Sequence, residues 1–192
     1  MIKIEDINAN IRVGMLDFGL FTEESKTISK REMERKGVLF LMEKMLKTTT
    51  FEIVYNEVNK PFLKGRSEKI SISHSHNWLV IALNQKEDIG VDIELIREKV
   101  INVKHKFLAD RELLYASSNI EILTLLWAAK EAIYKAYGKK EVEFKNILID
   151  EFVLNLSGEL NGTLKCYDSN RKYKLMYKKL DNYILALVTN EI

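Results

Sequence analysis

Residues 89–94 read Ile-Gly-Val-Asp-Ile-Glu, and this stretch decides the predicted fold. Apolar and acidic residues alternate in a short β-branched run, which predicts a strand. Side chains two apart on a strand share a face, so Asp92 and Glu94 point the same way while the intervening apolar residues point into the core. Two neighbouring carboxylates repel each other, and an oxygen-rich site of this kind suits Mg²⁺ better than Zn²⁺. Gly90 leaves room for a ligand or another backbone to approach.

A second stretch, residues 127–135, reads Trp-Ala-Ala-Lys-Glu-Ala-Ile-Tyr-Lys and predicts a helix that faces this strand. Trp127, Glu131 and Lys135 are spaced four residues apart, so on a helix they form one stripe. A third carboxylate facing the acidic pair would complete a metal site with positions left for a phosphate. The alternatives are a surface ion pair between Glu131 and Lys135, worth about 0.3–0.5 kcal/mol, and the wet face of an edge strand for the acidic pair. The Ala- and Leu-rich surroundings of Trp127 favour a buried helix, and buried carboxylates need partners.

Together, Gly-Val-Asp-Ile-Glu (90–94) and Trp-x-x-Lys-Glu-Ala-x-x-Lys (127–135) resemble the signature of the 4'-phosphopantetheinyl transferase superfamily, in its long, two-half form. The resemblance implies an α+β fold of two similar halves, each with a long helix packed on an antiparallel sheet. The halves would be related by a pseudo-twofold axis, with the active site in the cleft between them. We expect an N-terminal half at residues 1–86, on the coenzyme A phosphate side. The C-terminal half, residues 87–192, would carry the metal and the catalytic groups.

The hydrophobic pattern predicts elements that fit this architecture. In the first half we expect strands at 11–16, 51–56, 70–75 and 78–83 and a long helix at 25–47. In the second half we expect helices at 98–108 and 110–116, and a longer one that starts in a capping box, Ser118 to Glu121, and ends before Gly138. Four strands follow at 147–156, 163–167, 173–180 and 183–188, with turns at Asn161-Gly162 and Asp181-Asn182.

Composition limits the class of protein. The chain has 192 residues, of which 46% are hydrophobic, and a net charge of +2. That charge is too small to indicate nucleic-acid binding. The sole cysteine, Cys166, excludes an internal disulfide and fits a reducing compartment. The first 20 residues lack the apolar run of a signal peptide, and no segment is long and apolar enough to span a bilayer. We expect a cytoplasmic monomer that binds neither nucleic acid nor membrane.

The strand at 70–75 holds a histidine. Alternation puts His74 on the side of the two isoleucines, and a core histidine is the alternative to a phosphate-binding one. A Ser-His hydrolase is disfavoured because no Gly-x-Ser-x-Gly elbow is present. Ile-Ser-His-Ser is similar to the family's first motif, which implies that Ser73 and His74 contact coenzyme A.

Basic residues of the first half are further candidates for phosphate binding. Pro61 holds Lys60 in an extended conformation. The family carries Lys-Pro here, usually after Gly, and Asn59 replaces that Gly. In the long helix we expect Arg35 to bind phosphate, although Arg31 or Lys36 could replace it after a small change of register; a solvated helix face is the alternative for most of these cations.

The reaction that the resemblance implies moves the 4'-phosphopantetheine arm of coenzyme A to a serine of an apo acyl or peptidyl carrier protein, as in holo-[acyl-carrier-protein] synthase. Adenosine 3',5'-bisphosphate is the other product. Mg²⁺ on Asp92, Glu94 and Glu131 would hold the pyrophosphate, and Lys135 would add positive charge. Three bases remain open: Glu131, Glu112 from a looser Phe-x-x-x-x-Glu match at 107–112, and a metal-bound water.

Two other functions use the same residues. A Mg²⁺-dependent phosphohydrolase would also need three carboxylates and a lysine. A non-catalytic binder of coenzyme A or of carrier proteins would need no metal ligands, so the full acidic set argues against it.

Overall fold

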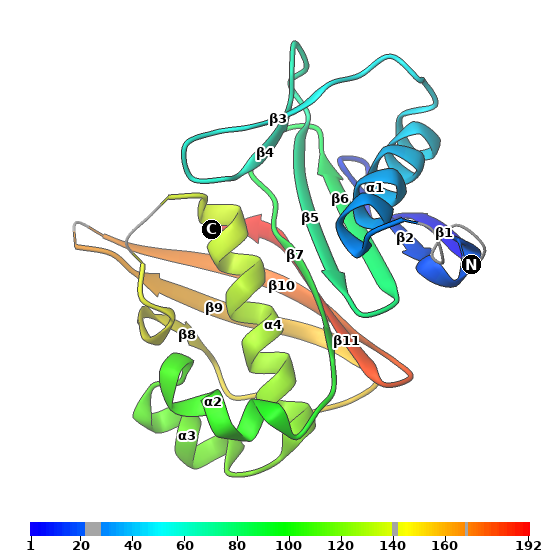
Figure 1. The fold of residues 1–192 in the computed structure, drawn as a ribbon. Coiled ribbons are helices and arrows are strands. Elements are labelled where there is room, and N and C mark those ends of the chain that lie inside the picture. The colour runs from blue at the N-terminus through cyan, green and yellow to red at the C-terminus, as the bar shows by residue number, and fades with distance from the viewer. Residues whose placement is uncertain (22–27, 140–141, 168) are drawn as a thin grey trace. The chain divides into compact units, whose positions relative to one another are not determined.

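The computed structural model describes residues 1–21, 28–139, 142–167 and 169–192. The chain divides into two compact units, Met1–Asp88 and Ile89–Ile192. Each unit has one antiparallel sheet packed against helices, so the α+β class is as predicted (Figure 1). In the described part of the chain, no helix has the length and apolar character needed to cross a membrane.

The first unit, residues 1–88, is a six-stranded sheet with one long helix. Its strands are β1 (Ile2–Asp6), β2 (Ile11–Asp17), β3 (Ile53–Tyr55), β4 (Pro61–Leu63), β5 (Lys69–Ser75) and β6 (Trp78–Asn84), in the order β1-β2-β6-β5-β4-β3. A 3₁₀ turn, η1 (Phe18–Phe21), follows β2. Helix α1 (Lys30–Leu46) packs on β2 and β6 through Leu41, Met42 and Met45, which are buried.

Helix α1 begins later than predicted. Ser29 is its N-cap: the serine hydroxyl accepts a hydrogen bond from the Glu32 amide at 3.3 Å, and the Glu32 carboxylate accepts one from the Ser29 amide at 3.1 Å. This reciprocal pair is a capping box, which sets the first helical residue at Lys30. The predicted start at Ser25 lies outside the described residues.

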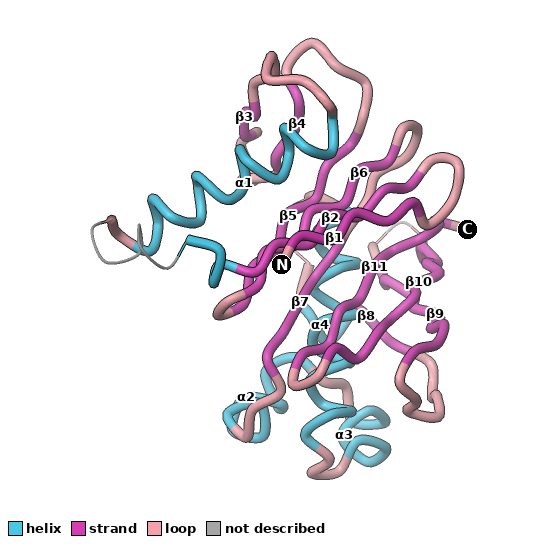
Figure 2. Tube along the Cα trace, turned by 90° about the vertical axis from the view of Figure 1, so that its right-hand side faces the viewer, coloured by secondary structure: helices cyan, strands magenta, loops and turns pink. Residues whose placement is uncertain are grey.

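The second unit, residues 89–192, is a five-stranded sheet covered by helix α4 (Figures 1 and 2). Its strands are β7 (Val91–Leu95), β8 (Ile147–Ile149), β9 (Ser157–Lys165), β10 (Asn170–Leu180) and β11 (Tyr183–Glu191), in the order β7-β11-β10-β9-β8. The helices are α2 (Lys99–Phe107), α3 (Asp110–Ala116) and α4 (Ile120–Tyr137), and η3 (Phe144–Asn146) is a 3₁₀ turn. Helix α4 packs on β7, β8 and β11, and α2 packs on α4.

The connectivity of the first unit recurs in the second. A strand leads to the long helix, four strands follow, and the last of them returns to pair with the first: β2-β6-β5-β4-β3 in one unit and β7-β11-β10-β9-β8 in the other. Strand β1 is an addition to the first unit, and α2 and α3 are insertions before α4.

Three further details predicted for the second unit are wrong. Asn161 and Gly162 lie inside β9 and form no turn. A Cβ atom at 162 would lie 2.4 Å from Ile133 Cδ1 of α4, so the absence of a side chain lets Ile133 pack there. The strand expected at 147–156 ends at Ile149. The cap of α4 is Asn119, whose side chain accepts from two backbone amides, and not Ser118.

Gly90, which directly precedes β7, lies against the backbone of α4. A Cβ atom at this position would lie 1.8 Å from the Ala132 carbonyl oxygen and 2.7 Å from the Ala136 amide nitrogen. Both are backbone atoms of a helix, which have no rotamer to change. The absence of a side chain at position 90 therefore makes room for the backbone of α4, which is one of the two roles predicted for Gly90 from the sequence. The close packing brings Trp127, Glu131 and Lys135 of α4 toward β7.

Candidate functional site: carboxylates of β7 and α4

Strand β7 presents its two carboxylates on one face, as predicted. Asp92 is opposite Ala186 of β11 and Glu94 is opposite Ile184, while Val91 and Ile93 are buried in the core. Asp92 is only 3% exposed, so the alternative of a wet strand face is wrong for this residue. A buried carboxylate needs a partner, and α4 supplies it.

The stripe of α4 contacts β7 at both of its ends. The Lys135 ammonium donates to Asp92 Oδ1 at 2.7 Å and to the Val91 carbonyl at 3.1 Å. The Trp127 indole N–H donates to Glu94 Oε1 at 3.0 Å. Lys135 therefore contacts β7. The alternative of a surface ion pair between Lys135 and Glu131 does not predict this contact.

Glu131, in the middle of the stripe, has a pKa well above the ordinary value of a glutamate. Burial, followed by the negative charge of Asp92, raises the pKa of Glu131 to about 7; Glu94 adds to the rise and Lys135 opposes it. Glu131 is therefore under the influence of both carboxylates of β7. A carboxyl with its pKa near neutrality, next to charged partners, is typical of functional sites.

The described residues contain no group of three or more His, Cys, Asp or Glu side chains already arranged to hold a metal ion. The positive charge that the structure places at Asp92 is the Lys135 ammonium. The chemistry of the donor set nevertheless fits a hard divalent cation, because Asp92, Glu94 and Glu131 offer oxygen atoms only and their mutual repulsion destabilises the ionised state.

Glu112 has a different environment from the other predicted catalytic residues. It is 2% exposed, and its two oxygens accept hydrogen bonds from Lys130 and from the backbone amides of Ala109 and Ile149. These bonds and its burial leave the carboxylate no access to a substrate proton. The geometry therefore argues against Glu112 as the base.

In the first unit, His74 lies on the side of β5 that alternation predicts, but it is not a core residue. Its side chain is 48% exposed, and its Nδ1 atom lies 3.4 Å from Glu34 Oε1 of α1. The core ends at Ile72, so the last residue on this face is open to solvent. Ser73, by contrast, is buried on the opposite face of β5.

A cavity of about 650 Å³ lies beside His74. Arg31 and Arg35 line it, together with Glu34, and so do the aromatic rings of Phe51 and Tyr55. The predicted Arg35 and its alternative Arg31 thus share one cavity with His74. Its combination of cations, aromatic rings and apolar side chains suits a nucleotide phosphate and a base.

Lys60 stands next to two residues of this cavity, Asn59 and Pro61, while its own ammonium contacts Asp88 at 2.8 Å. Asn59 has a φ of 59°, in the left-handed region that favours glycine and tolerates asparagine. Asn59 therefore meets the conformational requirement that a glycine meets at this point of the family motif.

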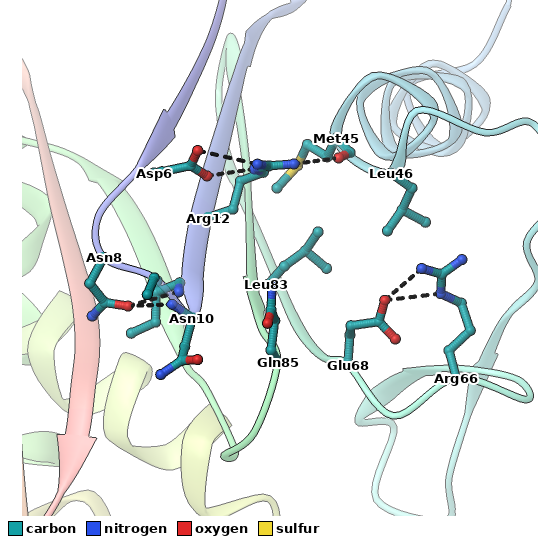
Figure 3. Close-up of a pocket in the computed structure, with 12 residues that line it drawn as sticks. Asp6, Asn8, Asn10, Arg12, Met45, Leu46, Arg66, Glu68, Leu83 and Gln85 are labelled. Atoms are coloured by element: carbon teal, nitrogen blue, oxygen red, sulfur yellow. Dashed lines mark hydrogen bonds and ion pairs between the residues drawn. The ribbon is translucent and has the colours of Figure 1, made fainter.

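Another cavity of the first unit, of about 450 Å³, contains no predicted site residue (Figure 3). Two ion pairs line it: Arg12 Nε with Asp6 Oδ1 at 2.6 Å, and Arg66 Nη2 with Glu68 Oε1 at 2.5 Å. Because each guanidinium already has a carboxylate partner, this cavity offers an anion little net attraction.

The residue that sequence reasoning missed is Lys130. It is completely buried beside Glu112, although lysine is rarely buried without a partner. The available signal was its place among the alanines of α4, where no exposed face remains for it.

Comparison with known proteins places these residues in context. The family model described as the 4'-phosphopantetheinyl transferase superfamily matches residues 88–188. The chain is 35% identical over 89 residues to the 4'-phosphopantetheinyl transferase gsp of Aneurinibacillus migulanus, which is 44% of this chain and 37% of that protein. It is 30% identical over 98 residues to a Synechocystis protein provisionally named as such a transferase, covering 46% of this chain and 40% of the relative. The match thus spans less than half the length of these relatives.

A third relative, a Haemophilus influenzae protein provisionally given the same name, is 22% identical over 200 residues. That match covers 85% of each chain.

The pKa of Glu131 predicts how stability depends on pH without divalent ions. The folded-state pKa, about 7, lies above the ordinary value of 4.5. The native state therefore binds more protons between these values, and stability falls as pH rises from about 4.5 through 7. Glu131→Gln should remove this loss, raising the free energy of unfolding by about 3 kcal/mol at pH 8 and little at pH 4.5.

Urea unfolding in EDTA at both pH values measures this difference. Glu159→Gln, which changes an exposed carboxylate of β9, is the control and should have little effect at either pH. An equal gain in the free energy of unfolding for Glu131→Gln at pH 4.5 and pH 8 would contradict the raised pKa of Glu131.

Proposed function

This chain belongs to the 4'-phosphopantetheinyl transferase superfamily, and from that premise we propose that it transfers the 4'-phosphopantetheine group of coenzyme A to a serine hydroxyl of an apo carrier protein. Adenosine 3',5'-bisphosphate is the second product. The observation that carries the proposal is the ion pair between Lys135 of α4 and Asp92 of β7, beside Glu131, whose pKa the charges of Asp92 and Glu94 raise. Displacement at a pyrophosphate depends mainly on positioning and on neutralising charge, and this group of residues is suited to both.

Asp92, Glu94 and Glu131 are the residues that would hold Mg²⁺. Their oxygen-only chemistry supports this role, and so does the raised pKa of Glu131, which a divalent cation would bring down. When bound, the ion would neutralise the pyrophosphate oxygens of coenzyme A. Trp127 would keep the Glu94 carboxylate in place through its indole N–H.

Glu131 is the proposed base for the serine hydroxyl. The competing carboxylate, Glu112, is ion-paired and buried, whereas Glu131 shares its environment with the other reacting groups. Lys135 balances the charge of Asp92, and its ammonium is the positive group beside these carboxylates that an incoming phosphate would meet.

The phosphates of the nucleotide would bind in the first unit. Arg31, Arg35 and His74 line one cavity there, which supports a phosphate site at this place. Lys60 and Ser73 stay as proposed contacts; because Ser73 faces away from His74, the two would contact different groups of the ligand. Coenzyme A and an acyl or peptidyl carrier protein are the proposed partners, and the proposed setting is a monomer in the cytoplasm.

Mass spectrometry of apo carrier proteins incubated with this protein, coenzyme A and Mg²⁺ tests the reaction. A serine should gain the phosphopantetheine mass. Asp92→Asn keeps the size of the side chain but removes the charge that Lys135 neutralises, and it should lower the rate at least 100-fold. Asp150→Asn, at a carboxylate 58% exposed, is the control and should retain the rate.

Circular dichroism should show that both variants are folded. Release of nucleotide without an acceptor would identify a phosphohydrolase instead, and an Asp92→Asn variant with the full Mg²⁺-dependent rate would exclude the carboxylate group from the reaction.

His74→Ala should raise the KM for coenzyme A about tenfold and change kcat less, because it removes a phosphate contact and leaves the carboxylates intact. The matched control is His105→Ala, on the exposed side of α2, which should leave both constants unchanged. Steady-state kinetics at a fixed carrier concentration measures them. An unchanged KM for the His74 variant would remove this residue from the binding site.

A further inference from the structure

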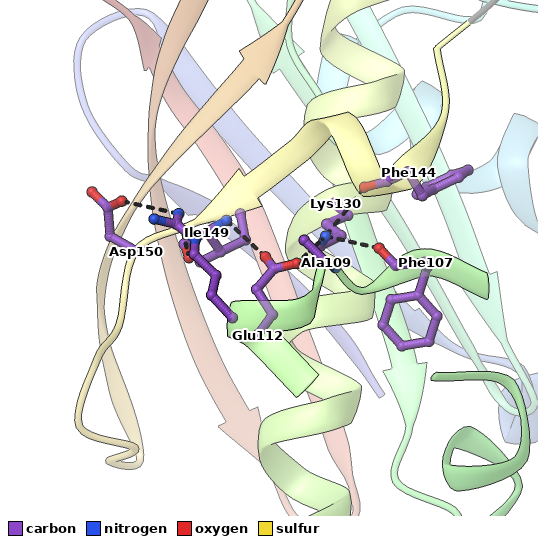
Figure 4. Close-up of polar contacts among 8 residues, drawn as sticks. Phe107, Ala109, Glu112, Lys130, Phe144, Ile149 and Asp150 are labelled. Atoms are coloured by element: carbon purple, nitrogen blue, oxygen red, sulfur yellow. Dashed lines mark hydrogen bonds and ion pairs between the residues drawn. The ribbon is translucent and has the colours of Figure 1, made fainter. Parts of the chain in front are cut away.

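A fully buried ion pair joins the helices of the second unit. The Lys130 ammonium lies 2.6 Å from Glu112 Oε2, and the two side chains are 0% and 2% exposed (Figure 4). Neither residue is a member of the carboxylate group on β7 and α4. The transfer reaction as described so far gives this pair no part.

Every proton of the Lys130 ammonium has an acceptor. Besides Glu112, Lys130 donates to the carbonyl of Phe107 at 2.8 Å and to that of Phe144 at 3.1 Å. Glu112 in turn accepts from the amides of Ala109 at 2.9 Å and Ile149 at 3.0 Å. The pair therefore fixes the end of α2, the start of α3, the turn η3 and strand β8 to one point on α4.

The two carbonyls that Lys130 binds belong to the residues that enclose Trp127. The Phe107 ring meets the indole edge-on, with centroids 4.9 Å apart, and the Phe144 ring stacks on it at 5.1 Å. The indole N–H then donates to Glu94 Oε1 at 3.0 Å. A continuous chain of contacts thus runs from the buried ion pair to a carboxylate of the functional site.

Stability alone is a poor explanation for such a pair. Removing two charges from water is costly, and apolar residues of similar volume often stabilise a core equally well. Burial lowers the pKa of Lys130, although Glu112 opposes this effect. What charge-assisted bonds supply, and apolar packing does not, is directional positions for the backbone atoms that they hold.

We propose that Lys130 and Glu112 are positioning residues: they fix the Phe107 and Phe144 backbones that enclose the Trp127 indole, and through that indole they orient Glu94. The effect on catalysis rests on the proposed transfer reaction. The effect on the indole does not.

The test replaces the pair by apolar side chains, Lys130→Met with Glu112→Leu, in a Trp78→Phe background so that Trp127 is the only indole. With the rings less firmly held, Trp127 emission should shift to the red by several nanometres and acrylamide quenching should rise about twofold. The kcat for transfer should fall about tenfold, with the KM for coenzyme A unchanged. The control is Lys179→Met with Glu121→Gln, which removes a more exposed ion pair of the same 2.6 Å length at the start of α4 and should change none of these values.

A second variant, Phe144→Leu, removes one enclosing ring without touching the ion pair and should reproduce the red shift and the loss of kcat. In a Trp127→Phe background, replacing Lys130 and Glu112 by apolar residues should lower kcat much less than it does when Trp127 is present. The reason is that the hydrogen bond from the indole to Glu94 is already lost in that background. Unchanged emission and quenching in both variants, or an equal loss of kcat with and without Trp127, would overturn the proposal. Changed emission in a protein without any transfer activity would contradict the proposed function and leave the positioning of the indole supported.

Discussion

The backbone of α4 lies so close to position 90 that even a methyl group there would collide with the Ala132 carbonyl. The rest of the second unit depends on this approach. It fixes the distance between a strand and a helix through main-chain atoms, so side chains on their facing surfaces have few rotamers to choose from. Lys135 reaches Asp92 across this junction, and Glu131 comes under the influence of both β7 carboxylates. The charges of Asp92 and Glu94 thereby raise the pKa of Glu131, and a carboxyl perturbed in this way is typical of functional sites.

The first unit repeats the connectivity of the second, but its strand β2 has no carboxylate at the positions that correspond to Asp92 and Glu94. Counted back from the last residue of each strand, Gly14 of β2 takes the place of Asp92 in β7, and Leu16 takes the place of Glu94. Leu16 is completely buried against α1. The same arrangement of strands and helix thus supports an apolar junction in one unit and a charged one in the other. The connectivity accounts for the framework, and a few side chains at the junction distinguish the second unit from the first.

Short-range patterns were sufficient to predict β7, the stripe of α4 and the side on which each residue lies, because side-chain direction follows from the period of the element. Short-range patterns were not sufficient where the burial or the role of a residue depends on partners that are distant in sequence. His74 lies on the predicted side of β5 but is exposed, since the extent of the core depends on α1. Gly162 resembled a turn residue, yet it makes room for α4 in the middle of β9. The alanines around Lys130 indicate that it is buried, but its partners, Glu112 and carbonyl groups from two other segments, are distant in sequence and no local pattern identifies them.

The central claim is that Asp92, Glu94 and Glu131 form one electrostatic group that a divalent cation relieves. The most direct measurement is an NMR titration of the Glu131 side-chain carboxyl in ¹³C-labelled protein, assigned with Glu131→Gln and recorded with and without Mg²⁺. The account predicts a midpoint near pH 7 in metal-free protein, as the pKa of Glu131 requires, and a fall of at least one pH unit when Mg²⁺ is added. A midpoint near the ordinary glutamate value of 4.5 without metal, or one that Mg²⁺ leaves unchanged, would contradict it.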